Sequence, residues 1–121
     1  MSILDLAQQY ISYLKEVGAS PDESFMDSPH PFAAKCKKII NGELVFETDQ
    51  DFKNQLKELT KISEGWHIEL ADQMAGTDGK TCVVRYFLTS KTLGKFTTIA
   101  ILRYDDSGAL EEVNEVYHPM A

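Results

Sequence analysis

The chain has 121 residues and a mass of 13.6 kDa, which predicts one domain over residues 1–121. Hydrophobic residues make up 43% and aromatic residues 10%, too many for a disordered chain, so a packed core is expected. The 12 basic and 19 acidic residues give a formal net charge of −7, which argues against nucleic acid and anionic membranes as partners.

The N-terminal segment carries Asp5 and Lys15 and lacks an uninterrupted apolar run, so it predicts mature protein in the cytoplasm. No stretch approaches the roughly 20 apolar residues of a membrane helix. Cys36 and Cys82 lie far apart, and neither has a second Cys or His at metal-ligand spacing, so we expect two buried thiols. Phosphate-loop, nucleophile-elbow and zinc motifs are absent from the sequence, which gives no support for a metal or a cofactor.

Apolar residues spaced by three and four predict a helix over Ser2–Val17, with Ser2 as its N-cap. The proline-rich segment that follows predicts a short helical turn after Pro21 and then a loop. Asp27 and His30 in this segment either close over a binding site or serve in ordinary turns, and we favour the turns.

Ala33–Glu47 predicts a β-hairpin, because two strand-forming runs flank Asn41-Gly42, the dipeptide typical of a type I′ turn. The short cluster Lys35, Lys37 and Lys38 is interpreted as a solvated strand edge. A second amphipathic helix is expected after the cap candidates that begin at Thr48, and it should end near Gly65.

From residue 66 onward the apolar period is 2, with turn signals between the runs, and this predicts an antiparallel four-stranded meander. The expected strands are Trp66–Met74, Thr81–Ser90, Lys95–Tyr104 and Ala109–His118.

Strict alternation assigns the side chains of each strand to two faces, and the more apolar face should pack against the helices. On the last strand this inner face would hold Leu110, Glu112, Asn114, Val116 and His118. The reverse face would then carry an apolar patch, which predicts a homodimer formed sheet to sheet, although scattered surface apolar residues are also normal in monomers. The patch consists of Val83, Phe87, Ile99, Ile101 and Val113.

Three segments of these strands match sequence patterns: Val84–Thr89 is similar to V-R-W-x-L-T, Ile99–Gly108 to I-S-x-L-R-x-x-D-G, and Glu112–His118 to E-x-W-E-V-Y-D. With these patterns the sequence resembles the nuclear transport factor 2-like superfamily, in particular its SnoaL-like branch. The resemblance implies an α+β, cystatin-like cone in which N-terminal helices pack on a curved, mostly antiparallel sheet around an apolar pocket. It also implies a range of activities, because the family includes isomerases, polyketide cyclases, dehydratases and epoxide hydrolases.

His118 and Asp72 are the candidate catalytic residues on the predicted inner face. Histidine exchanges protons near neutral pH, and an apolar pocket can raise the pKa of a carboxyl group into the useful range. His118 stands where resembling cyclases tend to carry an acidic residue. The simpler alternatives are an exposed residue near the C-terminus for His118 and a solvated carboxylate at a strand end for Asp72.

Other residues on the predicted inner surface are candidates for substrate binding. The tyrosines could donate hydrogen bonds from their phenolic hydroxyls, as a tyrosine does in the related ketosteroid isomerases. Tyr10 is a weaker candidate of this kind. The alternative interpretation is that these tyrosines belong to an ordinary aromatic core. The candidates are Tyr13, Trp66, Tyr86, Leu102, Tyr104, Glu112 and Asn114.

The leading functional hypothesis is a protein that binds a small apolar molecule in the cone pocket, as a cofactor-free isomerase, cyclase or hydratase-type enzyme. One alternative is a non-catalytic, homodimeric protein-interaction module. The other is a small subunit of a larger enzyme.

Overall fold

The computed structural model describes residues 2–19, 29–62 and 65–120. The expected helical turn after Pro21 and the loop residue Asp27 lie outside the described residues. The elements in chain order are α1 (Ile3–Ala19), β1 (Phe32–Ile40), β2 (Glu43–Phe46), α2 (Asp49–Ile62), β3 (His67–Ala75), β4 (Thr81–Ser90), β5 (Gly94–Tyr104) and β6 (Leu110–Pro119).

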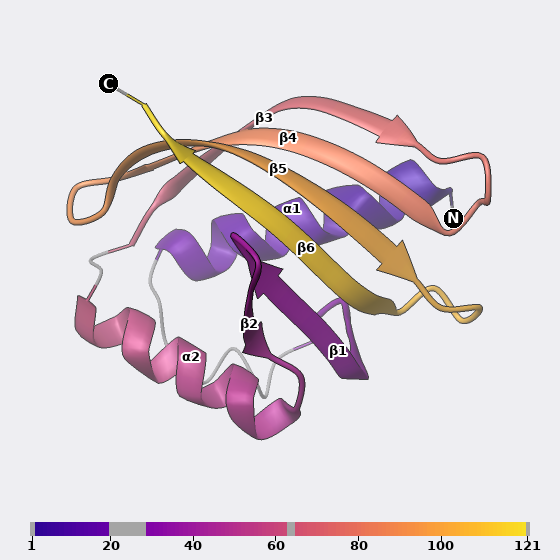
Figure 1. Cartoon of the computed structure of the whole chain (residues 1–121), viewed down its shortest axis with the longest axis horizontal. Helices are drawn as coiled ribbons and strands as arrows, with labels where there is room; N and C mark the ends of the chain where they lie inside the picture. The colour runs from indigo at the N-terminus through magenta and orange to yellow at the C-terminus, as the bar shows by residue number, and fades with distance from the viewer. Residues whose placement is uncertain (1, 20–28, 63–64, 121) are drawn as a thin grey trace.

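The six strands form one sheet in the order β2-β1-β6-β5-β4-β3. β1 pairs with β6 in parallel, and the other neighbouring strands are antiparallel, which confirms the predicted hairpin and meander. The sheet curves around α1, which lies along its concave side, while α2 lies below the sheet beside β2 (Figure 1). The expected α+β architecture of helices packed on a curved, mostly antiparallel sheet is therefore confirmed.

Both helices begin at the caps expected from the sequence. The Ser2 hydroxyl accepts a hydrogen bond from the Asp5 amide, and the Asp5 carboxylate accepts one from the Ser2 nitrogen. The Thr48 hydroxyl accepts from the amide of Asp51 at the start of α2. The first helix runs to Ala19 instead of Val17, because Gly18 continues the helix and does not end it.

The hairpin turn joins β1 and β2 as the Asn-Gly dipeptide predicts. Asn41 and Gly42 have φ angles of 50° and 81°, the left-handed values that a type I′ turn requires. Asn41 also binds β6, because its amide donates to the carbonyl of Glu115 and its side-chain oxygen accepts from the amide of Tyr117. The turn therefore fixes the position of β1 beside the last strand.

A β-bulge near the start of β6 reverses the predicted faces of the last strand. Arg103 pairs with Glu112 and Tyr104 pairs with Leu110, so Glu111 is an extra residue without a partner on β5. One extra residue moves every later side chain to the opposite face. The assignment of Glu112, Asn114 and His118 to the inner face was therefore wrong.

The same bulge moves Val113 from the predicted outer patch into the core, where it is fully buried. It also places the carboxylate of Glu115 on the inner side of the sheet, while Val116 becomes 56% exposed on the outer side.

β3 has a second bulge with the same consequence. Leu70 pairs with Tyr86 and Asp72 pairs with Arg85, so Ala71 is the extra residue. The side chain of Asp72, predicted to face inward, lies on the outer face together with that of Met74, which is 70% exposed.

The core lies between the concave face of the sheet and the two helices. Cys36 and Cys82 are both buried as free thiols, as expected. No helix in the described part of the chain is both long and apolar enough to cross a bilayer.

Candidate ligand-binding cavity

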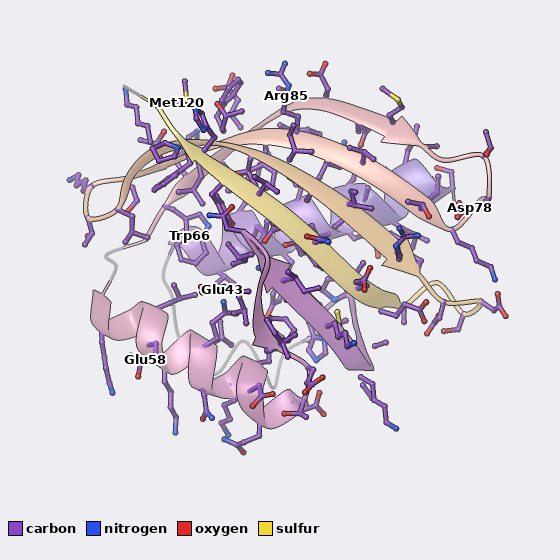
Figure 2. All side chains as sticks on the ribbon, in the orientation of Figure 1. Glu43, Glu58, Trp66, Asp78, Arg85 and Met120 are labelled. Atoms are coloured by element: carbon purple, nitrogen blue, oxygen red, sulfur yellow. The ribbon has the colours of Figure 1, made fainter. Side chains whose placement is uncertain are left out.

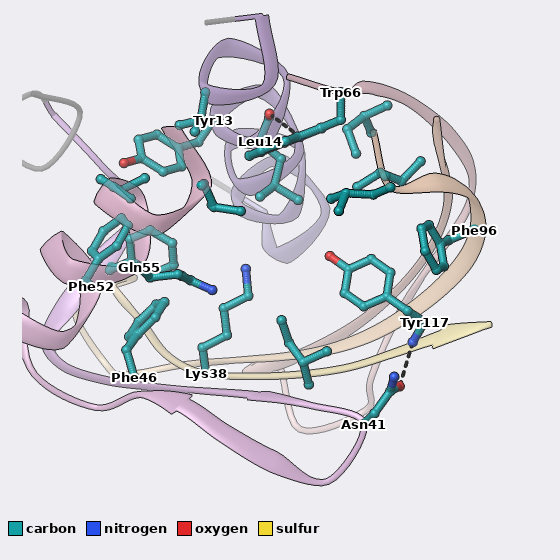
Figure 3. A pocket seen from close by; sticks show the side chains of 18 residues that line it. Tyr13, Leu14, Lys38, Asn41, Phe46, Phe52, Gln55, Trp66, Phe96 and Tyr117 are labelled. Atoms are coloured by element: carbon teal, nitrogen blue, oxygen red, sulfur yellow. Dashed lines mark hydrogen bonds between the residues drawn. The ribbon is translucent and has the colours of Figure 1, made fainter. Parts of the chain in front are cut away.

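A cavity of about 330 Å³ lies between α1, α2 and the concave side of the sheet, within the size range of small-molecule sites. Most of the side chains that line it are aliphatic or aromatic, and Figure 3 shows them around one common space. The lining consists of Tyr13, Leu14, Val17, Phe32, Lys38, Ile40, Asn41, Phe46, Phe52, Gln55, Leu56, Leu59, Trp66, Ile68, Leu88, Leu93, Phe96 and Tyr117.

An aromatic cluster forms one wall and joins both helices to β1 and β2. The Phe32 ring makes edge contacts with Tyr13, Phe46 and Phe52, at centroid distances of 5.5, 5.7 and 4.8 Å. His30 packs against the same ring at 5.6 Å, so this residue of the proline-rich segment contacts the wall. Edge contacts between large rings hold the wall in one arrangement while presenting an apolar surface.

Trp66 belongs to the opposite wall and is fixed to α1 by its polar atoms. Its indole N–H donates to the carbonyl of Leu14 at 3.1 Å, and its backbone amide donates to the carbonyl of Gly18 at 2.9 Å. A Cβ atom at residue 18 would lie 2.5 Å from the indole nitrogen, so only glycine leaves room for this ring. The sequence therefore uses Gly18 for close packing, where we expected the end of the helix.

Lys38 is the one charged side chain among the described residues that line the cavity. Alternation along β1 places it on the same face as Cys36 and Ile40, and it is only 7% exposed. Its ammonium group points into the cavity near the side chains of Gln55 and Tyr117 (Figure 3). The expectation that Lys38 belongs to a solvated strand edge was wrong, because β1 lies between β2 and β6.

Behind Lys38 lies Glu115, a fully buried carboxylate. Its Oε1 atom is 3.1 Å from Lys38 Nζ. Its Oε2 atom accepts hydrogen bonds from the hydroxyl groups of Tyr10 at 3.0 Å and Tyr86 at 2.5 Å. These partners satisfy both oxygens, which a buried carboxylate requires.

Tyr117 connects this cluster to the cavity. Its hydroxyl lies 3.1 Å from that of Tyr86 and donates at 3.5 Å to Glu115 Oε1. Burial raises the pKa of the Tyr10, Tyr86 and Tyr117 phenols well above the usual value, and the negative charge of Glu115 raises each further. The three phenols therefore stay protonated and act as hydrogen-bond donors at neutral pH. We call Lys38, Glu115, Tyr10, Tyr86 and Tyr117 the buried polar cluster.

Only some of the residues singled out in the sequence meet at this site. Tyr13 and Trp66 line the cavity, and Tyr86 lies behind it in the buried polar cluster. Leu102 and Tyr104 are buried in the core but are not among the described lining residues.

The four other candidates lie on the outer face of the sheet, away from the cavity. Asp72 is exposed and forms a salt bridge with Arg85 at 2.6 Å, and Arg85 projects from the side of the sheet opposite α1 (Figure 2). Glu112 pairs with Arg103 at 3.1 Å. Asn114 is half-buried opposite Ile101, and His118 is exposed opposite Thr97. The shared cause is the two bulges, which invert the ends of β3 and β6.

Sequence reasoning missed three residues of the buried polar cluster: Lys38, Glu115 and Tyr117. The alternation Cys36, Lys38, Ile40 was a usable signal for the lysine, since it places the lysine among apolar residues. A comparable signal existed in Val113, Glu115 and Tyr117, because Val113 belongs in a core more naturally than Asn114 does.

The cluster offers hydrogen-bond donors to a ligand. Lys38 and Tyr117 both line the cavity and both contact Glu115 Oε1, so their donor groups lie close together. Donors fixed in an apolar site can bind an acceptor oxygen and stabilise negative charge that develops on it. Among the described residues, no group of three or more His, Cys, Asp or Glu side chains could hold a metal ion.

Solved structures share this fold at low sequence identity. An NTF2-like protein of unknown function from an Exiguobacterium species has a TM-score of 0.74 and 16% identity over 95% of this chain and 99% of its own. A putative isomerase of the SnoaL-like family from Agrobacterium tumefaciens has a TM-score of 0.71 and 14% identity over 95% and 96%.

A third similar structure is an epoxide hydrolase/cyclase-like enzyme with a role in pyran ring formation in the polyether salinomycin, with a TM-score of 0.73 and 14% identity over 95% of this chain and 92% of its own. No protein-family model matches the sequence, and neither does any curated protein. At these identities the similarity confirms the fold expected from the resemblance, that of NTF2-like and SnoaL-like proteins.

Proposed function

We propose that this chain, which has the NTF2-like fold, binds a small and largely apolar molecule in the cavity between α1, α2 and the sheet. The observation that carries the proposal is the pairing of an apolar cavity of about 330 Å³ with the ammonium group of Lys38 and the hydroxyl of Tyr117. Apolar walls supply affinity by burying ligand surface, and a few placed polar groups fix the ligand's orientation.

The cost of the buried polar cluster supports a role in binding. A buried ion pair is seldom more stable than well-packed apolar residues of similar volume. The cluster nevertheless places a cation at 7% exposure and a fully buried carboxylate beside an apolar cavity. A ligand oxygen that receives hydrogen bonds from Lys38 and Tyr117 gives this arrangement a use.

Catalysis by a cofactor-free isomerase or cyclase mechanism would use the same two donors. Lys38 and Tyr117 would stabilise negative charge that develops on a carbonyl oxygen of the ligand. Two proteins of similar structure, a putative isomerase and an epoxide hydrolase/cyclase-like enzyme, accord with this extension of the proposal. His118 and Asp72 do not enter it, because both side chains lie on the outer face.

The binding proposal is tested with 2-ethylnaphthalene, an apolar probe that fits a cavity of this size. We expect it to raise the melting temperature of the wild-type protein in a thermal-shift assay, because it binds only the folded state. Leu59→Trp should remove this shift, since Leu59 lines the cavity and the larger ring would fill it.

Leu44→Trp is the matched control. Leu44 is 53% exposed on β2 and is not among the described lining residues, so the same substitution there should leave the shift unchanged. A folded wild-type protein with no shift, or an equal shift in both variants, would contradict binding in this cavity.

The outer face of the sheet supports a second function, homodimerisation. Ile99 is 48% exposed and lies opposite Val116, which is 56% exposed, and Met74 lies opposite Val83 on the same face. A cluster of exposed apolar side chains of this kind is typical of a protein–protein interface. The patch is the predicted one with Val113 replaced by Val116 and Met74.

Light scattering with size-exclusion chromatography tests this second proposal. We expect a wild-type dimer and a monomeric Ile99→Arg/Val116→Lys variant, whereas Leu44→Lys should stay dimeric. A monomeric wild type at high protein concentration would contradict it.

A further inference from the structure

The charge balance at the cavity limits the chemistry of the ligand, an inference that rests on the proposed function. Lys38 is the one charged group among the described lining residues, and Glu115 neutralises it at 3.1 Å from behind. We infer that Glu115 already serves as the counter-ion that Lys38 would otherwise find in the carboxylate of an anionic ligand. The cavity therefore accepts a neutral molecule bearing a carbonyl oxygen and rejects carboxylates.

Glu115 is held too firmly to give way to a ligand. Its Oε2 atom accepts from Tyr10 and Tyr86, and its Oε1 atom contacts Lys38 and Tyr117. These partners come from α1, β4, β1 and β6, so moving the carboxylate would break contacts with four elements. The negative charge therefore stays beside the cavity when a ligand enters.

The donors that remain favour an acceptor oxygen without charge. An ammonium group has three N–H donors, and Lys38 directs one toward Glu115. The one hydroxyl proton of Tyr117 goes to Tyr86 at 3.1 Å or to Glu115 at 3.5 Å, and turning it toward a ligand exchanges one of these hydrogen bonds for a bond to the ligand. One carbonyl oxygen can accept from both residues, and it carries no charge that must be stripped of water.

A carboxylate in the same place meets repulsion that a carbonyl does not. A ligand oxygen bound to Lys38 would lie within about 6 Å of the Glu115 carboxylate, given ordinary hydrogen-bond lengths on both sides of the ammonium group. At an effective dielectric constant of about 20, repulsion by Glu115 at about 6 Å cancels roughly half of the attraction by Lys38 at about 3 Å, which corresponds to roughly a hundredfold loss of affinity relative to an unpaired lysine. Entry into the apolar cavity also removes water from the charged ligand. An amine ligand would instead be repelled by Lys38.

Three probes with one ring system test this inference: 2-ethylnaphthalene, 2-acetylnaphthalene and 2-naphthoate. Calorimetric titration at pH 7 should show that the wild-type protein binds the ketone at least tenfold more tightly than the carboxylate. In Glu115→Gln the charge is lost but the shape is kept, and Lys38 becomes free to pair with the ligand. The ratio of the affinity for the ketone to the affinity for the carboxylate should then fall at least tenfold, mainly through tighter binding of 2-naphthoate.

Glu112→Gln is the matched control, because it makes the same change on the same strand at a residue that pairs with Arg103 on the outer face. It should keep the wild-type ratio. The variant Lys38→Met/Glu115→Gln removes both charges, and it is measured as well in case Glu115→Gln alone does not fold. We expect this double variant to bind the ketone less tightly than the wild-type protein does, because Tyr117 is the one donor of the pair that remains, and to bind 2-naphthoate weakly.

The outcomes separate the two proposals. Wild-type protein that binds 2-ethylnaphthalene but also binds ketone and carboxylate equally would overturn the inference about charge and leave the binding cavity intact. A ratio within threefold of wild type in Glu115→Gln would do the same. Failure of all three probes to bind folded protein would overturn the proposed function and this inference together.

Discussion

Breaking the Lys38–Glu115 pair should destabilise the fold far more than removing both charges at once. Glu115 is fully buried and Lys38 is 7% exposed, so each depends on the other for charge compensation. Lys38→Met leaves a buried carboxylate with phenolic partners alone, and we expect a loss of about 3–5 kcal/mol in the free energy of unfolding. For a chain of this length, the melting temperature should fall by roughly 10–20 °C.

The two single variants should differ because only Lys38 faces the cavity. In Glu115→Gln the ammonium group can be reached by water in the cavity, so the expected loss is smaller, about 1–3 kcal/mol. In Lys38→Met/Glu115→Gln no buried charge is left unpaired, and the loss should be well below the sum of the two single losses, with a coupling energy of about 2 kcal/mol or more.

Urea unfolding followed by circular dichroism measures the free energy of unfolding of the wild-type protein, the two single variants and the double variant. If Lys38→Met alone does not fold, recovery of a folded spectrum in the double variant shows the same coupling. Strict additivity of the two single losses would refute the account of the buried polar cluster.

Three further predictions concern groups around the cluster. All five tyrosines, at positions 10, 13, 86, 104 and 117, have pKa values raised chiefly by burial. The raised pKa values stabilise the folded state fully below the unfolded-state pKa of about 10, and this stabilisation is lost as the pH rises above that value. Absorbance at 295 nm should therefore report tyrosinate only together with unfolding. Gradual ionisation of the folded protein would contradict this. Gly18→Ala should lower the melting temperature and change the fluorescence of Trp66, because the new methyl group would displace the indole from Leu14, whereas Ala19→Gly should leave that fluorescence unchanged. Burial raises the pKa of the Cys36 thiol to about 12, so a thiol reagent should label it at the rate of unfolding, and fast labelling of folded protein would count against its burial.

The elements of the fold could be predicted because each has a local signal. Apolar spacing, the Ser2 and Thr48 caps and the Asn41-Gly42 turn all act within a few residues, and the structure has each where the sequence indicates. The resemblance added the overall architecture, which the meander alone does not determine.

The site could not be predicted in the same way, because it depends on two bulges and one long-range strand pairing. A bulge adds a single residue without a distinctive composition, yet Ala71 and Glu111 reverse the faces of everything that follows in their strands. The sequence places Lys38 in a short cluster with Lys35 and Lys37, and such a cluster predicts a solvated strand edge. Only the parallel pairing of β1 with β6 places it inside, beside Glu115.

We expect an apolar molecule with one carbonyl oxygen to occupy the cavity beside Lys38. The most direct test is a crystal structure of the protein with 6-bromo-2-acetylnaphthalene, in which anomalous scattering locates the bromine atom. The account predicts a bromine peak among the aromatic rings of the cavity, with the ketone oxygen within hydrogen-bond distance of Lys38 Nζ. A bromine site on the outer face of the sheet, or a cavity that stays free of ligand while the probe binds elsewhere, would contradict it.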